Sequence, residues 1–258
     1  MKHIAGVTML ELLCSLMISV IIVSGLTSIY GITQQHFKLQ TALLGLTENS
    51  RIMEQLWMTV IRSAVYQGCL KMKKANITPY YASDVKPGTD AITIRYADTM
   101  GDDLLLDMKD DSVMYVTSSH RFSINDDIMI SDCESVEFFK VKNVTVSTKN
   151  QKIISDKPLK KLYKKYSQVN LYQSESYYIG MIDALYRKNK NGHKMEIMEG
   201  INDMKFSFSI IQGGRVKDIS AGDFDDNNDI KGVGILLKHT SLIKNRMNKT
   251  QYIYVALR

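Results

Sequence analysis

The stretch MKHIAGVTMLELLCSLMISVIIVSGLTSIYGI, residues 1–32, decides the fold of this chain. Its residues from Leu12 to Ile32 carry no charge. An α-helix of this length reaches roughly 30 Å at about 1.5 Å per residue, which matches the hydrocarbon thickness of a bilayer. The pattern therefore predicts a membrane-spanning helix over residues 7–32.

The residues before this span do not form an ordinary signal peptide. A secretory signal places its small-residue cleavage site after the apolar core, whereas here Gly6 precedes it. The first six residues carry one positive charge, at Lys2, and a single carboxylate, Glu11, lies just inside the apolar stretch. We therefore expect a leader of residues 1–6 that is cut between Gly6 and Val7, with the apolar helix retained.

Charge and length define the remainder of the chain. The 258 residues, 45% hydrophobic and 23% charged, accommodate one span and one globular domain. The net charge of +6 falls to +5 when Lys2 is removed, a mild excess that does not require a nucleic-acid partner. The positive-inside rule places the N-terminus in the cytoplasm and the residues after Ile32 outside it, in the periplasm of a bacterial cell.

The three cysteines divide by location. Cys14 lies in the predicted span, where a small apolar side chain is ordinary. Cys69 and Cys133 lie in the oxidising compartment, so we predict a disulfide that closes a loop of about 65 residues and contributes at most about 4 kcal/mol. The spacings offer neither a CxxC redox site nor a zinc cluster.

A second helical segment continues from the span. An apolar stripe with helical spacing and a polar opposite side predict an amphipathic helix from about Gln34 to Tyr66, within residues 33–68, that ends at Gly68 and Cys69. The stripe comprises Leu39, Leu43, Leu46, Ser50, Met53, Trp57, Val60 and Ala64, and the polar side comprises Thr41, Glu48, Arg51, Gln55 and Arg62. A coiled coil would show the same stripe, but Trp57 and Ala64 favour packing against a sheet.

After a predicted loop from Lys71 to Gly88, residues 69–258 change to a period of two, which indicates half-buried antiparallel strands. The predicted strands are Ile92–Tyr96, Val113–Val116, Val136–Val146, Ser176–Arg187, Lys194–Ile197, Met204–Ile210, Gly232–Lys238 and Gln251–Leu257. The turn Lys188–Gly192, which ends in Asn-Gly, predicts a hairpin. The fold class is α+β, with a long N-terminal helix packed on an antiparallel sheet.

The leader resembles the class III prepilin leader of type IV pilins and type II secretion pseudopilins. The shared features are a short basic segment, Gly6, an apolar Val7 where the family usually has Phe, and Glu11 at mature position five. Later blocks resemble PilW-type minor pilins, with Lys149 to Gln173 fitting least well. These blocks are R62-S-A-V-Y-Q-G-C69, D90-A-I-T-I-R-Y96, F122-S-I-N-D-D-I-M-I-S-D-C133, Y177-Y-I-G-M-I-D-A-L-Y-R187 and M198-E-G-I-N-D-M-K-F-S-F208.

The resemblance implies a pilin fold and a non-enzymatic subunit that primes type IV pilus assembly, sits at the pilus tip and supports adhesion and twitching motility. It implies as partners a prepilin peptidase, other minor pilins, the major pilin, a PilY-type tip adhesin and the inner-membrane assembly platform. It also implies N-methylation of Val7 and pairing of Glu11 with the N-terminal amine of a neighbouring subunit. A J-type pseudopilin of type II secretion and a membrane-anchored module that binds DNA or another ligand are the alternatives.

Two further patterns have weaker interpretations. Asp223, Asp225, Asn227 and Asp229 match the first part of a calcium loop, but position twelve is Gly234, so a solvated acidic turn is the simpler reading. The segment Lys157–Tyr166 sets lysines among tyrosines, as a DNA-binding surface would, although an exposed loop gives the same pattern.

Catalytic motifs are missing from the sequence. The five histidines, which are His3, His36, His120, His193 and His239, lack metal-ligand spacing, and neither a G-x-S-x-G nor a Walker loop occurs. We therefore predict that the protein is not an enzyme and needs no cofactor, calcium being the one candidate.

Overall fold

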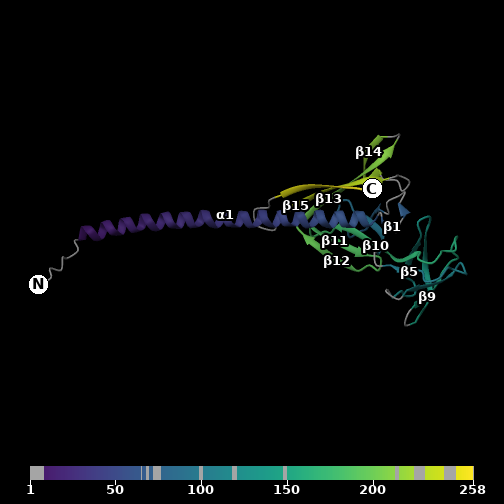
Figure 1. Ribbon diagram of the computed structural model, residues 1–258. Coiled ribbons are helices and arrows are strands. Elements are labelled where there is room, and N and C mark those ends of the chain that lie inside the picture. The colour runs from purple at the N-terminus through teal and green to yellow at the C-terminus, as the bar shows by residue number, and fades with distance from the viewer. Residues whose placement is uncertain are drawn as a thin grey trace.

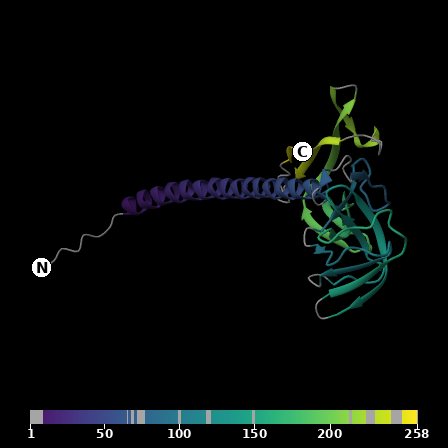
Figure 2. The same ribbon diagram turned by 45° about the vertical axis from the view of Figure 1, so that its right-hand side comes forward.

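The computed structural model describes residues 9–64, 66–67, 70–71, 77–98, 101–117, 121–147, 150–212, 215–223, 230–240 and 248–257. One long helix, α1 (Met9–Ser63), runs from the N-terminal end into a β-rich body (Figures 1 and 2). Its C-terminal part lies against strands, whereas its N-terminal part projects away from the body. The α+β class predicted from the sequence is confirmed at this level.

Strands of two to twelve residues follow the helix in the described part of the chain. The first group comprises β1 (Tyr66–Gln67), β2 (Leu70–Lys71), β3 (Ile77–Pro79), β4 (Ile92–Ala97), β5 (Asp102–Asp103), β6 (Val113–Thr117), β7 (Asp127–Ser131), β8 (Val136–Val146) and β9 (Asn150–Ser155). The second group comprises β10 (Gln168–Ile179), β11 (Ala184–Asn189), β12 (Lys194–Glu199), β13 (Ile201–Gln212), β14 (Arg215–Ser220), the 3₁₀ turn η1 (Ala221–Asp223), β15 (Ile230–Thr240) and β16 (Asn248–Ala256).

The larger strands form two antiparallel sheets. One has four strands in the order β14-β13-β15-β16, and the other follows the path β12-β11-β10-β7-β8-β9-β6. Strand β10 joins the two ends of the longer sheet: its first residues pair with β5 and β7, and its later residues pair with β4 and β11. This single strand therefore links the part of the body near α1 to a distal lobe built around β6–β9.

Each part has its own apolar core. The proximal core lies beneath α1 and combines side chains of β4, β10, β13, β15 and β16, while the distal core gathers side chains of residues 104–169. The ring of Trp57 lies at the junction of the two sheets, 5.4 Å from the ring of Tyr177 on β10 and 5.5 Å from that of Phe206 on β13. The distal lobe lies at the end of the molecule opposite the N-terminus (Figure 1).

The helix contacts the sheets through a narrower stripe than the sequence predicts. Its buried residues are Ala42, Leu46, Ser50, Met53, Trp57 and Ile61. Ala64, in the turn that follows the helix, is buried as well. Leu39 and Leu43 are 42% and 49% exposed, so their predicted place in the stripe is wrong. Val60 is half-buried and packs against the core, and Ile61, which was not predicted, is fully buried beside it. The predicted polar side is exposed throughout. The side chain of Gln251 on β16 donates to the Ser50 carbonyl at 2.9 Å and joins the helix to the sheet.

The predicted end of the helix is also wrong. We expected helix to about Tyr66, but α1 ends at Ser63, and Tyr66–Gln67 pairs with Leu70–Lys71 as a short hairpin. Strand pairing on both sides of the turn supplies the backbone hydrogen bonds that further helix would have supplied. Gly68 and Cys69 lie outside the described residues. Part of the predicted loop from Lys71 to Gly88 is strand as well, because β3 pairs with β4.

Most predicted strands are confirmed, with one clear correction. The segment Ser176–Arg187 is two strands, β10 and β11, separated by a turn in which Asp183 adopts φ 56°. The predicted Asn-Gly hairpin after β11 is confirmed: Gly192 has φ 84°, and the Asn189 side chain accepts hydrogen bonds from the backbone N–H groups of Asn191 and His193.

Candidate functional site

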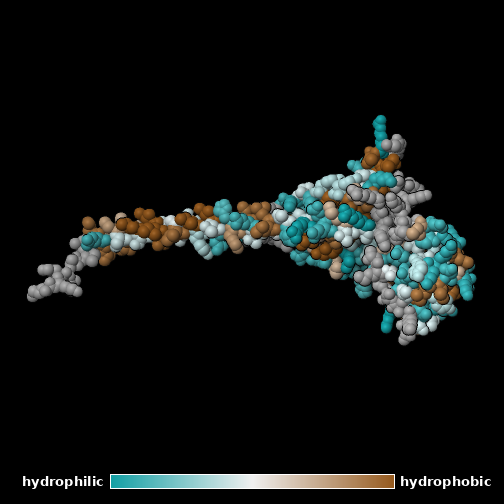
Figure 3. All heavy atoms as spheres, viewed as in Figure 1, coloured by the Kyte–Doolittle hydropathy of each residue, from teal (hydrophilic) through white to brown (hydrophobic). Residues whose placement is uncertain are grey.

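The projecting half of α1 is the largest exposed apolar surface on the described residues. Every residue from Met9 to Thr41 is exposed, over a length of about 50 Å. Large apolar side chains occur on all sides of this segment, including Leu16 at 54%, Ile21 at 69% and Leu26 at 61% exposure. Figure 3 shows this apolar surface along the projecting helix, followed by hydrophilic side chains before the body, where residues 33–41 are mostly polar. A helix that is apolar on every side is suited to lipid or to a bundle of similar helices.

Five hydroxyl side chains in this segment bond to the helix itself. The hydroxyls of Ser15, Ser19, Ser24, Thr27 and Thr33 each donate to a carbonyl three or four residues earlier, at 2.8–3.0 Å. In a bilayer there is no water for such groups, so internal bonding avoids several kcal/mol for each unsatisfied group. By length and composition α1 can cross a membrane.

The predicted processing and assembly residues lie at the start of this helix. Gly6 and Val7 lie outside the described residues, so cleavage and N-methylation stay predictions. Glu11 lies in the first turn of α1, where the partial positive charge of the helix N-terminus favours a carboxylate. Its sequence neighbours Met9, Leu10, Leu12 and Leu13 are apolar and exposed.

The cysteine and calcium predictions fall partly outside the described residues. Cys14 is a free, exposed thiol on α1, and Cys133 is disulfide-bonded. Cys69 lies outside the described residues, so its pairing with Cys133 stays a prediction. Of the calcium candidates, Asp223 accepts a hydrogen bond from Ser220 at 2.8 Å, and Asp225, Asn227 and Asp229 lie outside the described residues. Within the described residues, clusters of three or more His, Cys, Asp or Glu side chains suited to a metal are absent.

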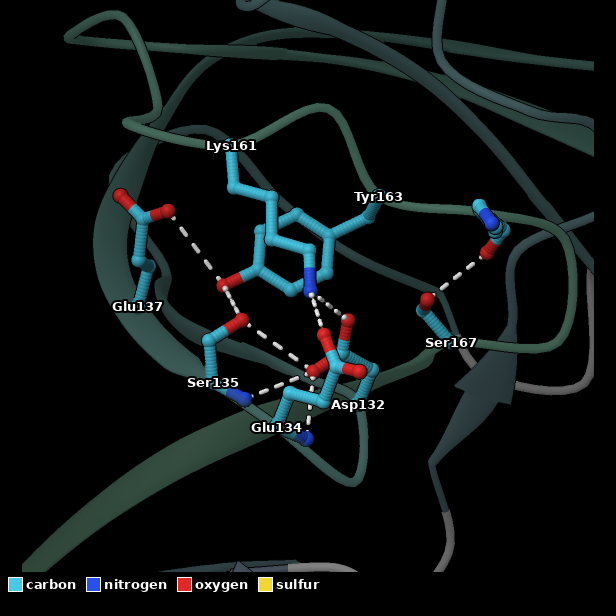
Figure 4. A network of polar contacts seen from close by, with 8 residues as sticks. Asp132, Glu134, Ser135, Glu137, Lys161, Tyr163 and Ser167 are labelled. Carbon is cyan, nitrogen blue, oxygen red and sulfur yellow. Dashed lines mark hydrogen bonds and ion pairs between the residues drawn. The ribbon is translucent and has the colours of Figure 1, made fainter.

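The lysine-rich segment 157–166 is an ordered loop on the distal lobe. Leu159 and Tyr163 point into the distal core, and Lys161 reaches the turn between β7 and β8, where it bonds Asp132 at 2.7 Å and Glu134 at 2.9 Å. Figure 4 shows these groups meeting around the ring of Tyr163. The loop is therefore fastened to the lobe by both apolar and charged contacts.

Burial and hydrogen bonding act in opposite directions on this network. Burial raises the pKa of Asp132, but hydrogen bonds from Lys161 and from the backbone N–H groups of Glu134 and Ser135 outweigh it and lower the pKa to about 2. Burial raises the pKa of Tyr163 to about 12. Hydrogen bonds to the carboxylates of Asp132 and Glu134 raise the pKa of Lys161. Asp132 therefore stays ionised and holds the loop in place above pH 4.

Sequence reasoning missed how this loop is held. The lysine pattern was compatible with a DNA-binding surface or with an exposed loop, and neither interpretation included the bonds of Lys161 to carboxylates 27 and 29 residues away along the chain. Of the apolar and aromatic side chains in the segment, Leu159 and Tyr163 are buried and Leu162 and Tyr166 are exposed, a division that the sequence alone did not signal.

The fold and the exposed helix define a class: an α+β protein whose one N-terminal helix is long and apolar enough to cross a membrane. Neither family models nor characterised proteins nor solved structures match this chain.

Proposed function

We propose that this protein is a minor pilin that primes assembly of a type IV pilus and remains at its tip. The observation that supports the proposal best is the division of α1 into two halves. Residues 9–41 are exposed and contain the uncharged, mainly apolar run from Leu12 to Ile32, and the buried stripe from Ala42 to Ile61 packs the same helix against a β-rich body. Such a helix suits a subunit that is stored in a membrane and then drawn into a helical bundle.

Glu11 sets the register of the subunit in this proposal. A charged group inside a bilayer costs up to about 2.5–3.5 kcal/mol, so a carboxylate in the first turns of an apolar helix has a functional role by default. After cleavage of residues 1–6, the methylated amine of Val7 in one subunit and Glu11 of its neighbour form a charge pair in the fibre core. The prepilin peptidase and the assembly platform act before that step, and the other pilins and a PilY-type adhesin surround the subunit afterwards.

Two alternatives share the helix and differ in the machine that uses it. A J-type pseudopilin of type II secretion would have the same leader and the same helix on a sheet, and the predicted Cys69–Cys133 pair favours the pilus. A membrane-anchored binding module would keep the anchor but would never leave the membrane. Deleting the protein and scoring surface pili and secreted type II substrates separately distinguishes the three.

The proposal is tested with Glu11→Ala against a matched control, Glu48→Ala. Glu48 lies on the same helix, is exposed, and is 4.0 Å from Arg51, a surface pair that contributes little. We expect both variants to be found in the membrane fraction, and only Glu11→Ala to be lost from fibres sheared off the cell surface. Normal recovery of Glu11→Ala in the fibres would contradict the proposed role of Glu11.

A further inference from the structure

Two adjoining hollows lie on the distal lobe, and Lys165 lines both. The first, of about 770 Å³, has Leu106, Met108, Met114 and Tyr115 among its lining residues. The second, of about 610 Å³, lies above the turn between β7 and β8 and is lined by Glu134, Lys164 and Tyr166, among others. We call the residues that line the two hollows the Lys165 surface. Its segment Lys164–Tyr166, which includes the lysine common to both hollows, is called the ridge.

The apolar part of this surface is open to a partner. Leu106 is 61% exposed at the rim of the first hollow, and the buried Met108 and Met114 line it. Methionine is flexible and polarisable, so such a hollow adapts to differently shaped aliphatic side chains. Tyr166 on the ridge is 71% exposed. Tyrosine side chains are enriched where proteins contact one another.

The charged part of this surface offers ammonium groups to a partner. Its carboxylates are used within the lobe: Asp107 accepts from the backbone N–H of Lys165 at 2.8 Å, Asp110 accepts from that of Ser112 at 2.9 Å, and Glu134 bonds Lys161. Lys109, Lys164 and Lys165 are exposed and have no carboxylate partner among the described residues. An approaching carboxylate therefore finds lysines available to pair with it.

The ridge is held rigidly before any partner arrives. The backbone N–H groups of Tyr166 and Lys160 donate to the Leu104 carbonyl and to Glu137, at 2.9 Å and 2.8 Å. Tyr166 adopts φ 71°, a conformation that bulky residues rarely take, and the Lys165 ammonium lies 4.8 Å from the centre of its ring. Local strain of this kind persists where the surrounding contacts enforce it and is typical of binding sites. A rigid surface also loses little entropy on binding.

We propose that the Lys165 surface docks a segment of a partner protein that carries spaced carboxylates and an aliphatic side chain. The aliphatic side chain enters the hollow beside Leu106, and the carboxylates pair with Lys109, Lys164 and Lys165. Nucleic acid fits this surface less well. Nucleic acid has no aliphatic side chain for the first hollow, which Leu106, Met108 and Met114 line. This inference does not depend on whether α1 enters a fibre.

The test uses the full chain in lipid nanodiscs and a random 12-residue phage-displayed peptide library, depleted first on empty nanodiscs. Enriched peptides are expected to combine Asp or Glu with Leu, Ile or Met. Binding of the best peptide should weaken about tenfold or more with Leu106→Asp and with the pair Lys164→Glu and Lys165→Glu. These side chains are exposed, so the variants should fold, and a thermal melt of each verifies this.

Two controls carry changes of the same kind elsewhere on the lobe. One matches Leu106→Asp, and the other is a single lysine charge reversal for comparison with the double one. Ile124 is 56% exposed and Lys142 is exposed on β8, and neither lines the two hollows. Ile124→Asp and Lys142→Glu should leave peptide binding within about twofold. A selection repeated on the Lys164→Glu, Lys165→Glu protein should instead enrich basic peptides.

Three outcomes would overturn the proposal. The first is a selection that does not enrich acidic and aliphatic residues together. The second is peptide binding that the control variants weaken as much as the variants of the Lys165 surface do. The third is a single-stranded oligonucleotide that binds with a strong salt dependence and displaces the selected peptide, which would assign the surface to nucleic acid.

Discussion

The two halves of helix α1 have the same backbone conformation and opposite surroundings. From Met9 to Thr41 every residue is exposed, whereas from Ala42 onward a stripe of small, aliphatic and aromatic side chains is buried against two sheets. The first half is uncharged from Leu12 to Ile32 and has large apolar side chains on all sides of that run, and it becomes mostly polar from Thr33 to Thr41. The second half is apolar on one side and has glutamate and arginine on the other.

This difference shows where the stability of each half comes from. Helices in water gain most of their stability from packing of an apolar stripe, so the second half depends on the sheets beneath it. Every residue of the first half is exposed in the described structure, and its apolar run is suited to lipid or to a bundle of similar helices. Four predictions follow from this contrast, beginning with the largest expected effect.

Replacing Trp57 tests the buried half most severely. Trp57 is fully buried between Tyr177 and Phe206, so Trp57→Ala should lower the free energy of unfolding by about 3–5 kcal/mol. Trp57→Phe should cost much less, because it keeps an aromatic ring and removes an indole N–H that has no hydrogen-bond partner in the described structure. Leu16→Ala in the exposed half is the control and should leave the melting curve of the body unchanged.

A charge on the exposed half tests membrane insertion. Ile21→Arg places a cation near the middle of the uncharged stretch, at a cost of about 2.5–3.5 kcal/mol for insertion. Ile52→Arg places the same charge on the solvent side of the second half, where Ile52 is 42% exposed. We expect carbonate extraction to release the Ile21 variant and to leave the Ile52 variant in the membrane. Equal retention of both would mean that residues 12–32 are not the span.

Acidification should lower the free energy of unfolding of the body at the place where the buried half of α1 meets the sheet. His239 is buried on β15, and its Nε2 lies 3.0 Å from the Gln251 oxygen, while the Gln251 amide holds the helix at Ser50. Burial lowers the pKa of His239, the Gln251 hydrogen bond raises it, and the charge of Lys249 lowers it, with a net decrease. Because the unfolded chain then binds the proton more readily, stability should fall as pH drops below about 6.5.

The measurement for His239 is the melting temperature at pH 7.5 and pH 5 in three proteins. The drop in the wild type should shrink in His239→Gln and persist in His193→Gln, which removes an exposed histidine from the hairpin after β11. If His239→Gln shows the same drop as the wild type, other groups cause the acid sensitivity.

The smallest effect concerns the point where burial begins. Leu43 has the spacing of the apolar stripe but is 49% exposed, so Leu43→Ser should change the free energy of unfolding by no more than about 0.5 kcal/mol. Leu46→Ala, one turn later and 5% exposed, should cost about 2–3 kcal/mol. Chemical denaturation of both variants in the same nanodiscs provides the comparison. A large effect at Leu43 would move the start of the buried half toward the N-terminus.

The contrast between the halves could be predicted from the sequence, but its boundaries could not. The uncharged stretch and the helical stripe are local patterns, and both are correct in kind. Whether Leu39 and Leu43 are buried depends on how far the sheets extend along the helix, which no local pattern records. The end of α1 at Ser63 likewise depends on the pairing of Tyr66–Gln67 with Leu70–Lys71. The prediction took Gly68 as the stop signal and therefore extended the helix about three residues too far.

Strands with one apolar side were predicted well, and strands with a different burial pattern were missed. β13 alternates clearly and was found. β9 turns Gln151, Ile153 and Ser155 inward, so two of its three buried residues are polar and no apolar alternation appears. Gln151 is accommodated because its side-chain oxygen accepts the backbone N–H of Phe122 at 3.1 Å. In the distal lobe β6 and β8 were therefore predicted and β9 was missed, and the two hollows that Lys165 lines depend on tertiary packing that no local pattern records.

The most direct test of the proposed function is mass spectrometry of the N-terminus of this protein in fibres sheared from the cell surface. Assembly as a minor pilin predicts a chain that begins at methylated Val7 and copurifies with the fibres, with the unprocessed chain remaining in the membrane. A chain that begins at Met1, or one confined to the membrane fraction while pili are present, would contradict it.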